Sequence, residues 1–242
     1  MKNVLVFDVN GTLLDLNVLD EPFVRLFGRA SARQEWFGIL QSLWMTDLLT
    51  NTYHSFDKLA QAALRMTVER WQVQPSTAGE SVLSKLTYAA ADTLGIDIPS
   101  EDESAILEGL KNLPPFPDVS SGLDALQRAG FRLVALSNGT RASTEQLLQK
   151  AGLADYFESV LSVETIKRFK PAPEAYQFAA DQLGVPLNQI CLVAAHAWDI
   201  AGASSVGCQT TFLQRPNQVL NPEGPKPDWL AADLVQLARQ LR

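Results

Sequence analysis

Short apolar runs alternate with helix-like repeats along most of this chain. The first run covers Val4 to Phe7 and predicts a buried β-strand that stops at the charged residue Asp8. Later runs predict further strands at residues 132–136, 159–163, 189–194 and 209–213. Between and after them, apolar residues three to four positions apart predict helices at residues 119–129, 141–151, 173–183, 199–206 and 229–241.

Strands that alternate with helices indicate βαβ units, which build a parallel sheet with helices on both of its faces. The glycines that follow the predicted helices support their ends, because a helix often stops at a residue in the left-handed conformation. These are Gly130, Gly152, Gly184 and Gly207. We therefore expect an α/β fold, a doubly wound parallel sheet that forms a Rossmann-like core.

The segment between the first strand and the Pro114-Pro115 pair has a different character. It shows helical periodicity at residues 56–71 and 80–94, with a break at residues 75–79. We expect a helical module of residues 16–112, inserted into a core domain of residues 1–15 and 113–242. Such a module would lie above the carboxyl ends of the strands and close over a site there.

Composition and charge narrow the class of protein. With 46% hydrophobic residues among 242, the chain can bury a full core. A net charge of −7 argues against nucleic acid or an anionic membrane as the partner. Cys191 and Cys208 lie in or beside apolar runs, which favours buried thiols in a reducing compartment. Asp8 interrupts the first apolar run and no membrane span follows, so we expect a cytoplasmic protein.

Polar residues follow four of the predicted strands, at the edge where open α/β sheets bind ligands. The first is Asp8, after which Gly11 lets the chain turn. Held at this turn with Thr12, the Asp8 carboxylate is placed for nucleophilic attack. Taken alone, Asp8 is equally well explained as a cap of its turn, and Asp15 as a cap at the entry of the helical module.

The other three sites also have ordinary structural explanations. Ser137-Asn138-Gly139 either holds an anion at a helix start or forms a polar turn. Lys170, with Tyr176 six residues later, either lowers the pKa of a nearby carboxylate or is a surface lysine. Asp199 either joins the site or caps the next helix, and His196 either relays a proton or supports the site from behind. Together, in this order, the four sites form a specific constellation.

These residues resemble the haloacid dehalogenase superfamily. The resemblance covers FDVNGTL at residues 7–13, LSNG at residues 136–139, the Lys170-Pro171 pair and the loop that ends at Asp199. The position of the helical module also fits, because it corresponds to the cap domain of that superfamily. The resemblance implies a Rossmann-like core with an inserted helical cap.

Two positions separate this chain from the magnesium-dependent phosphatases that make up most of the superfamily. Those enzymes exchange a proton through an Asp two residues after the nucleophile, whereas this chain has Asn10, whose amide cannot do so. They also hold magnesium with a pair of acids in the last loop, and here Ala195 stands near the place of one. A phosphatase remains the alternative enzyme. A non-catalytic small-anion-binding protein is a further alternative, but it has no use for Asp8, Lys170 and Asp199 together.

Within the superfamily the chain looks like a type II (S)-2-haloacid dehalogenase, which acts on short halogenated carboxylates. The spacing from Lys170 to Tyr176 and the Ala197-Trp198-Asp199 stretch agree with that subfamily. The resemblance implies that Asp8 displaces the halide from carbon with inversion, and that water then cleaves the resulting ester. Thr12, Lys170 and Asp199 are the implied helpers of that water. The resemblance implies no metal and no cofactor. It does imply a homodimer.

The same resemblance implies the substrate-binding residues. Backbone amides near Val9 and Asn10 would bind the substrate carboxylate together with Ser137, and Asn138 would contribute to the halide cradle. The remaining substrate-binding residues expected from their places in the family pattern are Tyr176, His196 and Phe37.

Three departures from the subfamily pattern concern the halide and the last loop. An arginine that helps to bind the halide is replaced by Phe37, and Arg25, Arg29 and Arg33 are all open as substitutes. His196 stands where Asn is usual, and alanines at 194 and 195 replace hydroxyl residues. A smaller halide, and with it fluoroacetate, therefore enters the range of expected substrates.

Aromatic residues of the helical module either shape an apolar pocket or pack its helices together. They are Trp36, Phe37, Trp44, Tyr53 and Phe56. Helix packing is the expectation for most of them.

Overall fold

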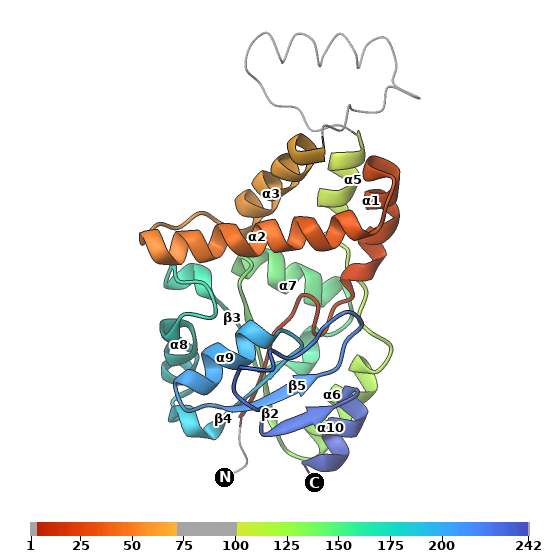
Figure 1. Cartoon of the computed structure of the whole chain (residues 1–242). Coiled ribbons are helices and arrows are strands. Elements are labelled where there is room, and N and C mark those ends of the chain that lie inside the picture. The colour runs from red at the N-terminus through yellow and green to blue at the C-terminus, as the bar shows by residue number, and fades with distance from the viewer. Residues whose placement is uncertain (1–3, 72–100, 242) are drawn as a thin grey trace.

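Six parallel strands form one sheet in the lower part of the molecule as drawn in Figure 1. The computed structural model describes residues 4–71 and 101–241. Neighbouring strands follow the order β3-β2-β1-β4-β5-β6, and the order reverses beside β1. This is the doubly wound α/β sheet that the alternating pattern predicted. The strands are β1 (Val4–Phe7), β2 (Arg132–Ser137), β3 (Ser159–Ser162), β4 (Ile190–Ala194), β5 (Gln209–Leu213) and β6 (Trp229–Ala231).

The central strand β1 is buried along its whole length between β2 and β4. Val6 lies opposite Val134 of β2 and Leu192 of β4. Because helices cover both faces of a parallel sheet, its inner strands have continuous apolar sequences rather than alternating ones. The helices of the core are α6 (Val119–Arg128), α7 (Arg141–Lys150), α8 (Pro173–Leu183), α9 (Ala197–Ser205) and α10 (Leu234–Gln240). Short 3-10 turns are η2 (Ala154–Tyr156), η3 (Val163–Thr165) and η4 (Leu187–Gln189).

The prediction of a last helix at residues 229–241 is wrong for residues 229–231. Trp229–Ala231 forms the edge strand β6, which pairs with β5. Helix α10 begins only after Asp233, whose carboxylate accepts the backbone N–H of Gln236 at 2.6 Å. A run of three apolar residues fits a strand or a helix equally well. These three form a strand because they pair with the edge of the sheet at β5.

Helical segments of the inserted module stand over the carboxyl edge of the sheet, with α2 directly above the core (Figure 1). They are η1 (Leu16–Leu19), α1 (Asp20–Phe27), α2 (Ser31–Thr50), α3 (Phe56–Trp71) and α5 (Glu101–Gly109). The predicted helix at 56–71 is confirmed as α3. The predicted helix at 80–94 and the break at 75–79 lie outside the described residues, and the domain boundaries at 15–16 and 112–113 stay predictions.

Helix α2 buries one face because large apolar residues recur on it every four positions. Trp36, Leu40 and Trp44 are each 1% exposed or less. This spacing places them on one side of the helix. The indole N–H of Trp36 donates to the carbonyl O of Ala60 on α3 at 3.1 Å, so packing and a hydrogen bond hold the two helices together.

Two chain segments that pass between the core and the helical module run side by side. The backbone N–H of Asp15 donates to the carbonyl O of Pro114 at 2.8 Å, and that of Phe116 donates to Leu13 at 3.0 Å. Asp15 also accepts the N–H of Asn17 and so caps η1, as predicted. These bonds couple the helical module to the turn that follows β1.

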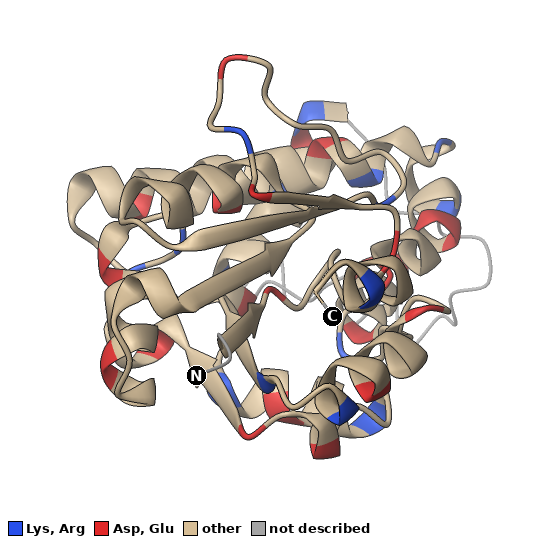
Figure 2. Ribbon diagram, turned by 90° about the horizontal axis from the view of Figure 1, so that it is seen from below, with Lys and Arg blue, Asp and Glu red and all other residues tan. Residues whose placement is uncertain are grey.

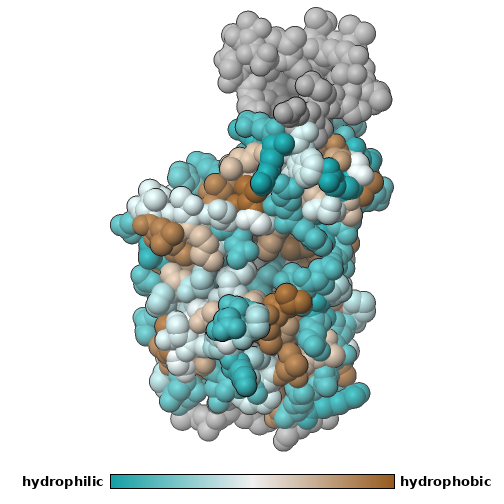
Figure 3. Space-filling model, viewed as in Figure 1, coloured by the Kyte–Doolittle hydropathy of each residue, from teal (hydrophilic) through white to brown (hydrophobic). Residues whose placement is uncertain are grey.

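Two further views, Figure 2 and Figure 3, show where the charged residues and the hydrophobic surface residues lie. Charged residues lie mainly on the helices and loops around the sheet when the molecule is seen from below (Figure 2). The space-filling view shows hydrophobic residues in separate small patches (Figure 3). Among the helices of residues 4–71 and 101–241, none is long and apolar enough to cross a membrane.

A buried ion pair fixes the turn after β1 to distant parts of the core. Arg215 Nε donates to the carbonyl O of Thr12 at 2.9 Å, and the other guanidinium nitrogens contact Asp118 at 2.6 and 3.1 Å. Asp118 also accepts the backbone N–H of Leu234 at 2.8 Å. Burial opposes the charge on Asp118, but its hydrogen bonds and Arg215 lower its pKa below the usual value. The guanidinium also lies 4.1 Å from the centre of the Phe116 ring.

We predict that Arg215→Met destabilises the protein by about 3 kcal/mol, because it leaves a partly buried carboxylate without its cation. Urea unfolding measures the loss. Arg239→Met, at an exposed arginine of α10, is the matched control and should cost less than about 0.5 kcal/mol. Equal losses in the two variants would show that the Arg215 ion pair is not needed for stability.

Candidate active site

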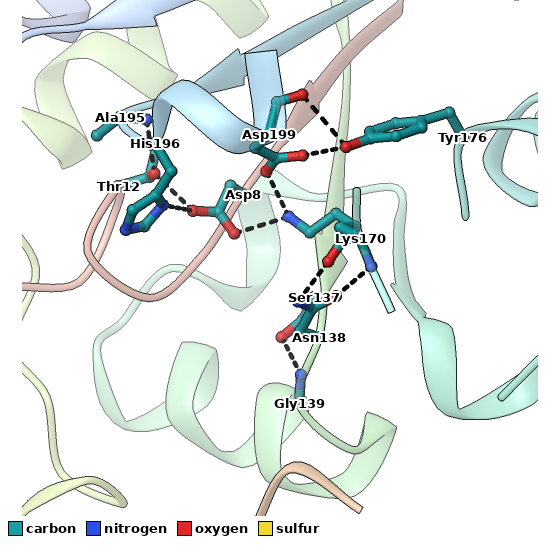
Figure 4. Close-up of polar contacts among 10 residues, drawn as sticks. All are labelled: Asp8, Thr12, Ser137, Asn138, Gly139, Lys170, Tyr176, Ala195, His196 and Asp199. Atoms are coloured by element: carbon teal, nitrogen blue, oxygen red, sulfur yellow. Dashed lines mark hydrogen bonds and ion pairs between the residues drawn. The ribbon is translucent and has the colours of Figure 1, made fainter. Parts of the chain in front are cut away.

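The site lies at the reversal of strand order, where open α/β sheets form a crevice. Asp8 follows β1, and His196 and Asp199 follow the neighbouring strand β4. Ser137 ends β2, on the other side of β1. Lys170 comes from the loop between β3 and α8. The four polar sites predicted from the sequence are therefore brought together (Figure 4).

Both oxygens of the Asp8 carboxylate accept hydrogen bonds (Figure 4). Lys170 Nζ lies 2.8 Å from Oδ1, while Thr12 Oγ1 lies 2.7 Å and His196 Nδ1 3.0 Å from Oδ2. Because an ionised carboxylate only accepts, Nδ1 of His196 must carry the proton in this contact. The Thr12 hydroxyl is itself oriented by the backbone N–H of Ala195, which donates to it at 3.0 Å.

Lys170 joins the two carboxylates of the site. Its Nζ lies 2.7 Å from Asp199 Oδ2 as well as 2.8 Å from Asp8 Oδ1, and its side chain is fully buried. The second oxygen of Asp199 accepts the hydroxyl of Tyr176 at 2.6 Å. Tyr176 thus lies behind Asp199, and it is not among the residues that line the catalytic cavity described below. The hydroxyl of Tyr176 thus holds Asp199 in position, and its contact with substrate stays a prediction.

These contacts move the pKa values of the two carboxylates in opposite directions. Burial alone would raise the pKa of Asp8, but Lys170 and His196 together hold it well below its ordinary value. Burial raises the pKa of Asp199 even though Lys170 opposes the shift. The pKa of Lys170 is raised, because Asp199 and Asp8 outweigh the effect of its burial. The pKa of Asp8 therefore lies below that of Asp199, so Asp8 is the more readily ionised carboxylate of the two.

The turn after β2 holds Lys170 by its backbone. Asn138 Oδ1 accepts the N–H of Lys170 at 2.8 Å, and Asn138 Nδ2 donates to the Lys170 carbonyl O at 3.3 Å. Ser137 Oγ accepts the N–H of Gly139 at 2.9 Å, which leaves the Ser137 hydroxyl hydrogen for another acceptor. The expected anion site at this turn therefore depends on the Ser137 hydroxyl, since the Gly139 N–H is already used.

His196 is held between two aromatic rings. Its ring stacks on Phe37 at 5.7 Å and on Trp198 at 5.1 Å between centroids, with interplanar angles of 21° and 22°. A Cβ at Gly11 would lie 3.1 Å from His196 Nε2, so the glycine, with its φ of +79°, also makes room for this ring. His196 Nε2 itself is buried and has no hydrogen-bond partner in the described part of the chain.

Around Asp8 lies a cavity of about 20 Å³, which we call the catalytic cavity. This volume holds roughly one water molecule. Besides Asp8, its polar lining is Asn10, Ser137, Asn138 and His196, and its aromatic lining is Phe37, Trp44, Phe56 and Trp198. Phe37, Trp44 and Phe56 therefore shape a pocket as well as packing helices.

None of the arginines considered as substitutes lines the catalytic cavity. Arg25 pairs with Glu21 at 2.9 Å, and Arg29 lies 3.6 Å from the centre of the Trp71 ring. Arg33 forms an ion pair with Asp20 and is used within the helical module.

The turn after β1 also presents free polar groups. Among the described residues, no protein acceptor is found for the backbone N–H of Val9 or of Asn10. The side-chain Oδ1 of Asn10 is buried, and none of the described residues is its hydrogen-bond partner. Because buried polar groups are normally paired, these groups are candidates for contact with a bound ligand.

The structure also corrects the start of the helix after β4, which the pattern places at Asp199. Helix α9 begins at Ala197, with His196 at its N-cap. Asp199 is therefore not the cap of this helix, and its carboxylate belongs to the site. Arg215 was missed altogether, because no local pattern links it to Thr12.

Comparison with known proteins agrees with this geometry. The family model described as haloacid dehalogenase-like hydrolase matches residues 2–207. This chain belongs to that family of hydrolases.

Within the family it is similar to (S)-2-haloacid dehalogenases. That of Pseudomonas sp. (strain YL) is 30% identical over 236 residues, which cover 95% of this chain and 90% of that protein. (S)-2-haloacid dehalogenase 4A of Burkholderia cepacia is also 30% identical over 236 residues, with 98% and 90% covered. The crystal structure of an L-2-haloacid dehalogenase matches with a TM-score of 0.83 at 25% identity, covering 99% of this chain and 98% of that one.

We predict that Lys170→Met raises the pKa of Asp8, because burial then acts with less opposition. NMR titration of isotope-labelled aspartate carboxyl carbons measures the shift. In the wild type, Asp8 should stay ionised as the pH falls through the ordinary range of aspartate, whereas in the variant it should gain its proton at higher pH. Lys58→Met, at an exposed lysine of α3, is the matched control. An unchanged Asp8 titration in Lys170→Met would contradict the assigned role of Lys170.

Proposed function

We propose that this hydrolase removes the halogen from short 2-haloalkanoic acids and produces the corresponding 2-hydroxy acids. The observation that carries the proposal is the state of Asp8, a buried carboxylate kept ionised by Lys170 beside a small aromatic cavity. The amide of Asn10 stands where a phosphatase needs a proton donor. Displacing a halide from carbon needs a nucleophile but no proton on the leaving group, so this site suits that reaction.

In the first step, an oxygen of Asp8 attacks the carbon that bears the halogen. The new carbon–oxygen bond makes an ester of Asp8, and the halide leaves with the electron pair of the carbon–halogen bond. Attack from the side opposite the halide inverts the configuration at that carbon. Ester formation removes the charge of Asp8, and Lys170 keeps Asp199 as its partner throughout.

The substrate carboxylate is proposed to bind at the turns after β1 and β2. The N–H groups of Val9 and Asn10 have no protein acceptor among the described residues, and the Ser137 hydroxyl has its hydrogen to donate. Asn10 and Ser137 line the catalytic cavity, and such donors suit a carboxylate because hydrogen bonds to a charged acceptor are strong.

In the second step, water attacks the carbonyl carbon of the Asp8 ester. Thr12 and Lys170 hydrogen-bond Asp8 directly, Asp199 is joined to Asp8 through Lys170, and the family resemblance assigns all three to the positioning of the water. Asp199 takes a proton from it, since its raised pKa makes it the stronger base. The carbon–oxygen bond between Asp8 and the alcohol oxygen breaks, and the alcohol oxygen takes the proton held by Asp199. Asp8 then releases the second proton of the water to solvent and returns as a carboxylate.

The leaving halide needs donors other than an arginine in this cavity. The indole N–H groups of Trp44 and Trp198 are buried with no partner among residues 4–71 and 101–241, and both residues line the catalytic cavity. We infer that they receive the halide, with a contribution from Asn138 as the family resemblance implies. Fluoroacetate is included among the proposed substrates, because Phe37 stands where the subfamily pattern has its halide-binding arginine.

The residues present do not fit the magnesium site of a phosphatase. Lys170 Nζ lies between Asp8 and Asp199, where it neutralises both carboxylates. The Ala195 side chain supplies no oxygen ligand, although magnesium needs several. Phosphate-ester hydrolysis is therefore the alternative that the tests below have to reject.

The location and the assembly of the protein stay predictions. A cytoplasmic location is proposed from two free, buried cysteines, Cys191 and Cys208, whose burial raises each pKa to about 12. Such thiols are kept protonated and suit a reducing compartment. A homodimer is proposed from the family resemblance.

We predict halide release from chloroacetate, bromoacetate, fluoroacetate and 2-chloropropionate in the presence of EDTA. A halide-selective electrode or ion chromatography measures it. Asp8→Asn should abolish the release, because an amide is a poor nucleophile at carbon. Asp181→Asn, at an exposed aspartate of α8, is the matched control and should keep full activity. If no halide is released from any of the four acids, and phosphate is released from small phosphoesters in a magnesium-dependent reaction, the protein is a phosphatase instead.

The ester on Asp8 has a direct isotopic test. In heavy-oxygen water with enzyme in excess, a single turnover should give a 2-hydroxy acid without the label, because its new oxygen comes from Asp8. The label should appear in the Asp8 carboxylate, as mass spectrometry of the peptide would show. Labelled product in the first turnover would mean that water attacks the substrate directly.

A further inference from the structure

Two hollow spaces of very different size meet at the ring of Phe37. One is the catalytic cavity of about 20 Å³. The other, which we call the outer pocket, has a volume of about 440 Å³ between α2 and the loop after β5. Among the described residues, Phe37 is the one that lines both spaces. Its side chain is therefore the wall between them.

The contacts of Phe37 hold this wall in place without a covalent or polar bond. Its ring stacks on His196 at 5.7 Å and meets the Trp44 ring edge-on at 5.9 Å, with an interplanar angle of 78°. Behind the ring, the outer pocket is polar, because it is lined by Asn17, Arg33, Gln34, Gln41, Asn217 and Gln218. Shortening the side chain at this one position would thus join the two spaces.

Another pocket also adjoins the catalytic cavity, and here more than one residue lines both spaces. A second pocket of about 540 Å³ between α3, α5 and α7 shares three residues with the cavity, namely Asn10, Phe56 and Gly139. Removing the Phe56 side chain leaves the other two in place. Phe56 therefore offers a matched comparison, as an aromatic wall residue on the side where more than one residue closes the cavity.

We propose that Phe37 limits the substrates to the shortest 2-haloacids by closing the catalytic cavity against the outer pocket. This inference rests on the proposed dehalogenase function. Asp8, Asn10, Ser137 and Phe37 all line the catalytic cavity, and its volume of about 20 Å³ has no room for a longer substituent on the halogen-bearing carbon. With Phe37 in place, the cavity offers little room for it. With Phe37 shortened, the substituent enters the outer pocket.

The experiment compares kcat/KM for bromoacetate, 2-bromobutanoate and 2-bromohexanoate in the wild type, Phe37→Ala, Phe37→Leu and Phe56→Ala. The wild type should prefer bromoacetate over 2-bromobutanoate by about tenfold or more, as expected for extra methylenes in a closed pocket. In Phe37→Ala, the ratio of 2-bromobutanoate to bromoacetate should rise about tenfold or more, with 2-bromohexanoate following. Phe37→Leu should give a smaller rise, and Phe56→Ala should leave the ratio within about threefold of the wild type.

Several results would overturn the inference. Equal kcat/KM of the wild type on the three acids would do so without any variant. So would an unchanged ratio in Phe37→Ala, a rise in Phe56→Ala as large as that in Phe37→Ala, or loss of bromoacetate turnover in both Phe37 variants while circular dichroism shows them folded. A wild type that releases halide from none of the acids would instead refute the proposed function, so the two failures are distinguishable.

Discussion

The ammonium group of Lys170 is fully buried, and the rest of the site is arranged around it. A buried charge is costly unless it is paired, and Lys170 has two carboxylates within 2.8 Å. In return, it keeps Asp8 ionised in a place where burial alone would favour the protonated acid. The same lysine therefore serves the fold and the chemistry. A substitution of Lys170 therefore affects both the charge of Asp8 and the packing of the core.

Several neighbouring residues hold this group of charges in place. Asn138 binds the backbone of Lys170 on both sides, and Tyr176 fixes Asp199 from behind. Thr12 is placed by the backbone of Ala195 and by Arg215. Above them, the aromatic rings of the helical module leave a cavity of about 20 Å³. Excluding water in this way strengthens every electrostatic contact below it.

The sequence predicts the sheet and most of the helices around it. Continuous apolar runs and apolar residues at helical spacing are both patterns within a short stretch of sequence. This prediction fails at residues 229–231, where three apolar residues fit either element and an open sheet edge selects the strand. It also misplaces the start of α9. Asp199 looks locally like a cap, and only the approach of Lys170 shows its carboxylate to be part of the site. Tyr176 is close to Lys170 in sequence, yet it contacts Asp199 and not the catalytic cavity.

The sequence by itself determined the doubly wound sheet, the constellation at its carboxyl edge and the direction of the chemistry, because Asp8, Asn10 and Lys170 are informative as residue types in order. The tertiary structure decided what depends on distance between remote segments. It placed His196 beside the carboxylate of Asp8, paired Arg215 with the turn at Thr12 and set Phe37 between two cavities. Such contacts join residues far apart along the chain. No local pattern records them, since they arise only when the strands and the helical module pack together.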